Sequence, residues 1–376
     1  MRTRPVVPLP ALLALAALAP ACGGGGSPAG PGPNPTPTPV TGSPVSGVVF
    51  YDENGNGVLD AGEDVRLPGV TVNVGGRTGQ STAGGAFTVT GVAAGAQTAR
   101  AQTLPPYFLA GNGTGVTVPQ AAGTPVFVPA TLPIGTNRVG RFMAFGDSLS
   151  AGEGSSDDAG YRSWLEADLR AYWGEAELRN QGQAGTRSNA GESRIDGVLA
   201  NERPAYTLIL YGTNDWNELE CKASLPCFTI DSLRSMIRQT RDRNSLPIVG
   251  TIPPVNTTYA DRAPQERQDW VRQMNDLVRP MVAQEGAVLA DLHAAMLRES
   301  DLTALFTDHV HPNDRGYQII GREWFRAITT TSASASAAMQ IGETVEAGDL
   351  YLAPADAVRH PSGTSPLADR HRRAGR

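Results

Sequence analysis

Two patterns of apolar and polar residues divide this chain of 376 residues. In residues 44–133, short runs of β-branched and aromatic residues alternate with glycine-rich turns. The clearest runs are at 45–51, 70–74, 86–90 and 126–128. Because no helical period is visible in this part, the pattern predicts a small all-β sandwich domain.

From residue 137 onward, apolar runs alternate with amphipathic stretches. The runs predict strands at 141–145, 177–180, 207–211, 247–252 and 288–292. Apolar residues recur at helical spacing in 161–172, 230–237, 270–281 and 317–325. Strands that alternate with helices favour an α/β domain over residues 138–329, in which helices cover both faces of a parallel sheet.

The N-terminus has the composition of an export signal over residues 1–22. Arg2 and Arg4 precede a short apolar segment at 12–18, which is too short to span a bilayer. Cys22 stands where a bacterial lipoprotein signal has its lipidated cysteine. An ordinary secretory signal cleaved near Cys22 is the alternative. In either case we expect an extracytoplasmic protein, which is membrane-anchored through Cys22 or secreted.

Two further segments are unsuited to a packed core. Residues 23–43 are rich in Gly and Pro and predict an extended linker, whereas residues 330–376 predict a tail with at most partial order. The whole chain is mildly acidic, with 31 Lys and Arg against 37 Asp and Glu. Such a balance argues against a surface that follows phosphates, so nucleic acid is not an expected partner.

Cys221 and Cys227 are close enough in sequence to form a small-loop disulfide in an oxidising compartment. The sequence does not decide whether they pair. A catalytic thiol is the weaker interpretation, because neither cysteine lies in a turn of the kind that presents a nucleophile.

Residues 52–63 have the pattern of a twelve-residue calcium loop. Its expected oxygen ligands are the side chains of Asp52, Asn54, Asn56, Asp60 and Glu63 and the carbonyl of Val58. Hard oxygen donors at alternate positions suit Ca²⁺, so a structural calcium ion is expected, and a solvated Asp/Asn/Gly turn is the alternative. Segments 47–52 and 67–72 resemble the B-type repeats of bacterial surface adhesins, which are calcium-stabilised β-sandwiches.

Four polar segments lie beside the predicted α/β elements. Segments 146–149, 180–185 and 211–215 each follow a predicted strand, and segment 308–313 precedes the last predicted helix. The carboxyl ends of parallel strands meet at one edge of a sheet, which is where α/β proteins bind ligands. Together and in this order, the four segments resemble those of the GDSL/SGNH hydrolases over residues 138–329.

This resemblance implies a three-layer, flavodoxin-like α/β fold and a catalytic serine. The signature positions are Ser148, Gly182, Asn214 and His311. Ser148 would be the nucleophile, His311 its general base, and Asp308 the residue that orients the base. The backbone N–H groups of Ser148 and Gly182 and the amide of Asn214 would form the oxyanion hole. No cofactor is needed for this chemistry.

Other residues near these segments compete for the same roles. His309 is nearer to Asp308 in sequence, but the spacing of the family favours His311 as the base. Asp147 and Asp215 are interpreted as residues that orient loops. Asp291 and His293 are interpreted as a structural strand end, because no second cluster with metal-ligand spacing accompanies them.

The resemblance implies hydrolysis of carboxylic esters, with an acylated carbohydrate or a lipid ester as substrate. An O-acyltransferase that uses the same site is one alternative. A surface adhesion or binding protein with a vestigial hydrolase domain is another.

Overall fold

The computed structural model describes residues 42–333, and these residues all belong to one compact unit. The predicted signal, the predicted linker up to residue 41 and the tail beyond residue 333 lie outside the described residues. Within the described part, no helix has both the length and the apolar character needed to cross a membrane.

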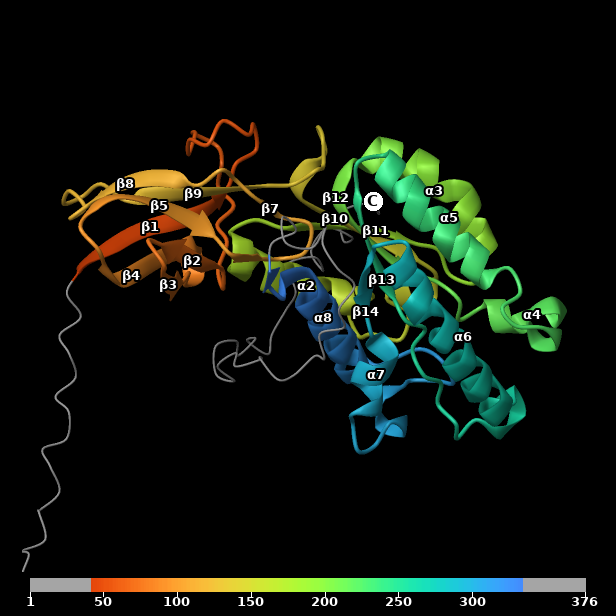
Figure 1. Cartoon of the computed structure of the whole chain (residues 1–376). Helices are drawn as coiled ribbons and strands as arrows, with labels where there is room; N and C mark the ends of the chain where they lie inside the picture. The colour runs from red at the N-terminus through yellow and green to blue at the C-terminus, as the bar shows by residue number, and fades with distance from the viewer. Residues whose placement is uncertain (1–41, 334–376) are drawn as a thin grey trace, which may run out of the picture. The chain divides into compact units, whose positions relative to one another are not determined.

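The first part of the described chain is all-β, as predicted, and forms two four-stranded sheets with orders β4-β1-β9-β7 and β3-β2-β5-β8 (Figure 1). Their strands are β1 Ser43–Tyr51, β2 Thr71–Val74, β3 Arg77–Gln80, β4 Ala86–Val92, β5 Gly95–Ala101, β7 Leu109–Ala110, β8 Thr114–Val118 and β9 Val126–Thr131. A short strand, β6 Thr103–Leu104, pairs with β15 Ser332–Ala333. Alternate residues such as Val45, Val49, Val72 and Val74 are fully buried, which is the pattern of strands that contribute one face to a core.

The second part is an α/β domain built on a five-stranded sheet in the order β11-β10-β12-β13-β14. The strands are β10 Arg138–Gly146, β11 Glu177–Gly182, β12 Pro204–Leu210, β13 Leu246–Gly250 and β14 Val288–Ala290. All four pairings between neighbours are parallel. The predicted fold class is therefore confirmed.

Helices cover both faces of this sheet (Figure 1). The α-helices of this domain are α1 Ser148–Ala151, α2 Tyr161–Trp173, α3 Ser188–Glu202, α4 Leu219–Ala223, α5 Thr229–Asp242, α6 Pro264–Gln284, α7 Leu292–Leu297 and α8 Asp314–Thr329. On β10, Phe142 and Ala144 join the core that contains α2 and α8, whereas Met143 and Phe145 join the core that contains α3, α5 and α6. Alternate strand residues thus supply the two cores of a three-layer domain.

The all-β part of the chain, strands β1 to β9 at residues 43–131, is called the β-region below. The β-region and the α/β domain share one of these cores. Phe108 packs edge-on against Trp173, with ring centroids 5.9 Å apart. The hydroxyl of Tyr107 donates to the carbonyl of Pro247 at 2.5 Å and accepts from the N–H of Val288 at 3.1 Å. Pro247 and Val288 lie at the amino ends of β13 and β14, so the β-region is anchored at the end of the sheet opposite the carboxyl ends.

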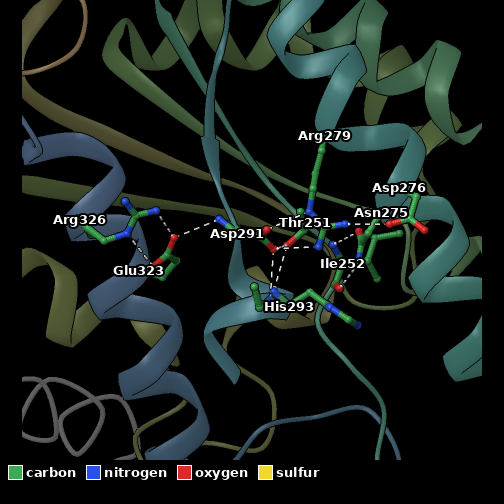
Figure 2. A network of polar contacts seen from close by, with 10 residues as sticks. Thr251, Ile252, Asn275, Asp276, Arg279, Asp291, His293, Glu323 and Arg326 are labelled. Atoms are coloured by element: carbon green, nitrogen blue, oxygen red, sulfur yellow. Dashed lines mark hydrogen bonds and ion pairs between the residues drawn. The ribbon is translucent and has the colours of Figure 1, made fainter. Parts of the chain in front are cut away.

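A polar network joins β14 to its neighbouring helices (Figure 2). The side chain of Asp291 caps α7 and accepts from Thr251 Oγ1 at 2.9 Å and from Arg279 Nε at 2.8 Å. The backbone N–H of Asp291 donates to Glu323 on α8 at 3.1 Å, and Glu323 also pairs with Arg326. Asp291 is thus engaged as a helix cap, in agreement with its structural interpretation.

Candidate active site

The nucleophile segment lies at the carboxyl end of β10, the second strand of the sheet. Ser148 begins α1, and Asp147 caps this helix by accepting from the N–H of Leu149 at 2.9 Å. Gly146 ends the strand at a close approach to β12, since a Cβ here would lie 2.3 Å from the carbonyl oxygen of Leu210. Only glycine fits at this crossing, and the tight strand-to-helix turn fixes where Ser148 points.

Ser148, His311 and Asp308 form a hydrogen-bonded chain. Ser148 Oγ lies 2.9 Å from His311 Nε2, and His311 Nδ1 lies 2.7 Å from Asp308 Oδ2. Because Asp308 is an acceptor, Nδ1 carries the proton and Nε2 is free to accept the proton of Ser148. The structure therefore brings the proposed nucleophile, base and orienting acid together in the order that acyl transfer requires.

Asp308 is held as an anion in the loop before α8. Its Oδ1 accepts from the backbone N–H groups of His311 at 2.7 Å and Val310 at 2.8 Å. Partial burial raises the pKa of the Asp308 carboxyl, but the hydrogen bonds from His311 and the two backbone groups outweigh this and lower it overall. The charged form that orients an imidazole is thus favoured.

His309 occupies a different position from His311. Its Nδ1 is 3.8 Å from Asp308 Oδ1, whereas His311 lies in hydrogen-bonding contact with both Asp308 and Ser148. Burial and then the nearby charge of Arg267 lower the pKa of His309. The backbone carbonyl of His309 accepts from the N–H of Asn256 at 3.0 Å, which ties this loop to the loop after β13.

Gly182 and Asn214, the other two signature residues, end β11 and follow β12. A Cβ on Gly182 would lie 2.2 Å from the backbone nitrogen of Ala151, so glycine lets α1 approach β11 closely. The Gly182 N–H donates to Asn180 Oδ1 at 3.0 Å. The amide of Asn214 donates to the carbonyl of Thr186 at 3.0 Å and to Asp147 at 3.4 Å. These two of the three proposed oxyanion donors thus have acceptors within the protein, and the longest of their contacts is the one from Asn214 to Asp147.

Asp147 and Asp215, which lie in the polar segments 146–149 and 211–215, are fully buried and connect loops. Asp215 accepts from the N–H and hydroxyl of Ser188 at 2.9 and 2.6 Å and from the hydroxyl of Thr229 at 2.7 Å. Among the described residues, the donors near the Asp147 carboxylate are the backbone N–H groups of Leu149 and of Asp147 itself and the distant Asn214 amide. Burial, reinforced by the charge of Asp215, raises the pKa of Asp147 to about 7. Both residues orient loops, as their sequence context indicates.

Sequence reasoning missed two charged residues of the site. Arg267 on α6 is buried, and its guanidinium donates to the carbonyl of Thr213 at 2.7 Å, one residue before Asn214. Burial lowers the pKa of Arg267 to about 10. Its role is to hold the segment that carries Asn214. No single-sequence signal could reveal this contact, because Arg267 looks like one more polar residue of an amphipathic helix.

Glu153 is the second missed residue. Its Oε2 lies 3.2 Å from His311 Nε2, on the same ring nitrogen that faces Ser148. About half of its side chain is exposed, at 48%. The imidazole of His311 therefore has a carboxylate on each side, Asp308 at Nδ1 and Glu153 at Nε2.

The predicted calcium loop is closed by hydrogen bonds among its own residues. Asp52 and Glu63 are buried, and Asp52 accepts from the backbone N–H groups of Gly55 and Gly57 at 2.7 Å. The amides of Asn54 and Asn56 both donate to Asp60 Oδ2 at 2.7 Å. Across residues 42–333, no three His, Cys, Asp or Glu side chains are placed to hold a metal ion.

Cys221 and Cys227, whose pairing the sequence left open, form a disulfide in the structure. The bridge closes the loop between α4 and α5. The carbonyl of Cys221 accepts from the indole N–H of Trp270 on α6 at 2.9 Å, which fixes this loop to the α6 side of the domain.

A parallel α/β sheet with a Ser–His–Asp chain at its carboxyl edge defines a serine hydrolase, and the order of the signature segments makes it an ester hydrolase of the SGNH type. Residues 144–319 match the profile of the GDSL-like lipase/acylhydrolase family. The matched residues lie within the α/β domain, which is therefore similar to that family.

Solved structures similar to this chain cover about half of it. The lipase/acylhydrolase from Enterococcus faecalis is 23% identical, with a TM-score of 0.43 over 50% of this chain and 95% of that one. A variant of Axe2, an acetyl xylan esterase from Geobacillus stearothermophilus, is 22% identical, with a TM-score of 0.42 over 50% of this chain and 94% of that one. A member of the lipolytic G-D-S-L family from Veillonella parvula is 17% identical, with a TM-score of 0.43 over 50% and 98%. No curated protein matches the chain.

Proposed function

We propose that the protein hydrolyses carboxylic esters outside the cytoplasm through an acyl-enzyme on Ser148. The observation that supports this most directly is the chain of hydrogen-bonding distances from Ser148 Oγ through His311 to Asp308, 2.9 and 2.7 Å. The proposed substrates are esters of acylated carbohydrate or of lipid.

Proton transfers through His311 account for both halves of the reaction. Ser148 Oγ attacks the carbonyl carbon while His311 Nε2 takes the hydroxyl proton and Asp308 stabilises the imidazolium. The oxyanion is bound by the N–H groups of Ser148 and Gly182 and by the Asn214 amide. Gly182 gives up its hydrogen bond to the Asn180 side chain for this, and Asn214 gives up its long contact to Asp147. Nε2 then protonates the leaving alcohol, and in deacylation it takes a proton from water and returns it to Ser148.

A panel of p-nitrophenyl esters of increasing acyl length tests this function, with wild type and Ser148→Ala assayed side by side. We expect hydrolysis of at least one ester and a loss of about 10³-fold or more in kcat for the variant. Equal activity of the two proteins on every ester cleaved would overturn the proposal.

His311 and His309 form a natural pair of variants for assigning the base. His311→Ala should lose activity to a similar extent as Ser148→Ala, because His311 is the one side chain among residues 42–333 that hydrogen bonds to Ser148 Oγ. His309→Ala should keep kcat within about tenfold of wild type. The reverse result would reassign the base.

An acyltransferase using the same site differs only in the group that attacks the acyl-enzyme, a sugar hydroxyl in place of water. Product analysis in the presence of acceptor sugars separates the two. Free acid as the main product supports hydrolysis, and an acylated acceptor as the main product supports transfer.

For the β-region we propose a structural calcium ion held by the loop 52–63, supported by the hard oxygen donors at alternate positions and by the burial of Asp52 and Glu63. We propose that Cys22 is the attachment point of a lipid anchor, supported by the export-signal pattern before it. Incorporation of labelled palmitate into wild type but not into Cys22→Ala tests the anchor.

A further inference from the structure

The environment of His311 Nε2 determines what the leaving alcohol meets. During acylation the oxygen of the leaving alcohol must come within hydrogen-bonding distance of Nε2 to receive its proton. A group that lies against Nε2, apart from Ser148 itself, therefore lies against the alcohol part of the substrate. Glu153 is such a group, with Oε2 3.2 Å from Nε2.

The backbone of Glu153 is held firmly next to the nucleophile. Its N–H donates to the carbonyl of Ser148 at 3.1 Å, and its carbonyl accepts from the hydroxyl of Tyr317 at 2.6 Å. Three residues on, Ser156 donates through both its N–H and its hydroxyl to Asp314 at the start of α8, at 2.8 and 2.7 Å. The loop is thus attached to α1 and to α8, which holds the backbone of Glu153 beside the nucleophile and places its carboxylate within reach of Nε2.

The carboxylate of Glu153 can accept further hydrogen bonds. Within the described part of the chain, Glu153 forms no ion pair with an arginine or lysine, and its contact with His311 Nε2 becomes an ion pair only when the imidazole is protonated. While Nε2 is unprotonated, it accepts from Ser148, and two acceptors cannot hydrogen bond to each other. Since no side chain of residues 42–333 donates to Glu153 in this state, its carboxylate is left to accept from water or from a donor that the substrate brings.

We infer that Glu153 selects the alcohol part of the substrate by accepting a hydrogen bond from a second hydroxyl next to the esterified oxygen. This inference rests on the proposed function and narrows its substrate class. When the leaving oxygen is at Nε2, a hydroxyl on the neighbouring carbon of the alcohol comes within reach of Oε2. Carbohydrates and glycerides are polyols that carry such neighbouring hydroxyls. Alcohols that carry an anionic group are repelled by the same carboxylate.

Two small esters isolate this contact. 2-Hydroxyethyl acetate and 2-methoxyethyl acetate have the same acyl group and the same two-carbon alcohol, but only the first offers a hydroxyl donor. We expect wild type to favour the hydroxyl ester in kcat/KM by about five- to tenfold, as one hydrogen bond to a half-exposed charged acceptor allows.

The variants Glu153→Met, Glu153→Gln and Asp157→Asn complete the test. Glu153→Met keeps the length of the side chain but removes the acceptor, so the ratio of the two kcat/KM values should fall to about one, and Glu153→Gln should be intermediate. Asp157→Asn removes the same charge from an exposed position on the same loop and should keep the wild-type ratio. Because a ratio of two substrates does not depend on the fraction of folded enzyme, partial misfolding of a variant does not obscure the result.

The possible results distinguish a failure of the inference about Glu153 from a failure of the proposed esterase function. A wild-type ratio near one, or a ratio in Glu153→Met equal to that of wild type, overturns the role of Glu153 while Ser148-dependent hydrolysis continues. If neither acetate nor any p-nitrophenyl ester is cleaved in a Ser148-dependent way, the proposed function fails and the inference fails with it.

Discussion

At the scale of single residues, Asp147 is a buried carboxylic acid whose ionisation affects the stability of the fold. Its carboxyl is fully buried beside the nucleophile, it has no cation as a hydrogen-bonding partner among the described residues, and burial raises its pKa to about 7. In the unfolded chain an aspartate has a pKa of about 4. The difference means that ionised Asp147 destabilises the fold.

We predict a stability difference between wild type and Asp147→Asn that depends on pH. Below about pH 4 both the folded and the unfolded state hold the proton, so Asp147 contributes no pH dependence. Between about pH 4 and pH 7 only the folded state keeps it, so the free energy of unfolding of wild type falls as pH rises. The variant lacks this loss and should gain on the order of 3 kcal/mol relative to wild type between pH 4 and pH 8.

Urea titrations at several pH values measure this difference. Asp269→Asn, at an exposed position of α6, is the matched control and should follow the wild-type curve. Parallel curves for wild type and Asp147→Asn would show that Asp147 ionises normally in the folded protein.

The candidate site residues that the sequence predicts differ in one respect from those that only the structure reveals. Ser148, Gly182, Asn214 and His311 stand in short segments with a recognisable order, so a single sequence identifies them. Glu153 and Arg267 act through contacts with residues distant in sequence, His311 and Thr213. No local pattern reports such a contact, because it exists only once the sheet has assembled.

At the scale of elements, the contact between α1 and β11 positions the nucleophile. Gly182 allows this contact, since a Cβ there would lie 2.2 Å from the backbone nitrogen of Ala151 and 2.6 Å from the backbone carbon of Ser150. Backbone atoms cannot rotate away as a side chain can. A side chain at residue 182 must therefore push α1, and Ser148 with it, away from the sheet.

Gly182→Ala should consequently lose both stability and turnover. We expect a destabilisation of about 1–3 kcal/mol from overpacking and a fall in kcat of about 10²-fold from the displaced nucleophile. Gly197→Ala on α3 is the control, because a Cβ there meets no neighbour within 4 Å. Steady-state kinetics and thermal melts of the two variants measure these effects, and a Gly182→Ala enzyme with wild-type kcat would contradict the account.

Elements with a strong apolar period were predicted, and those without one were not. The five strands of the α/β sheet and helices α2, α5, α6 and α8 fall at the predicted places. Helix α3 was missed because Ser, Asn and Gly interrupt its buried positions Ser188, Gly191, Ile195 and Leu199. Strands β3, β5 and β8 were missed because they contain few of the large apolar residues that mark a strand.

At the scale of the whole described chain, the β-region and the α/β domain share a core. Phe108 contacts Trp173, and Tyr107 bonds to the backbone at Pro247 and Val288. We therefore expect the two regions to unfold together, in one thermal transition that abolishes esterase activity and β-structure at the same temperature. Two separate transitions would contradict a shared core.

The proposed calcium ion gives this coupling a second test. If Ca²⁺ binds the loop 52–63 of the folded protein, it stabilises by mass action everything that unfolds with the loop. The temperature at which activity is lost should rise by several degrees in excess calcium compared with chelator. Asp60→Asn should reduce this rise, and an unchanged inactivation temperature in wild type would count against the ion.

Tyr107 also bears on how this gene can be cut and recombined. Its hydroxyl satisfies the backbone at the start of two strands of the catalytic sheet, and neighbouring Phe108 covers Trp173. A hydrolase fragment that starts at residue 138 would expose an indole ring and leave those backbone groups to water. The β-region therefore completes the packing and hydrogen bonding of the α/β domain. A chimaera in which another domain replaces the β-region must also supply new partners for Pro247, Val288 and Trp173.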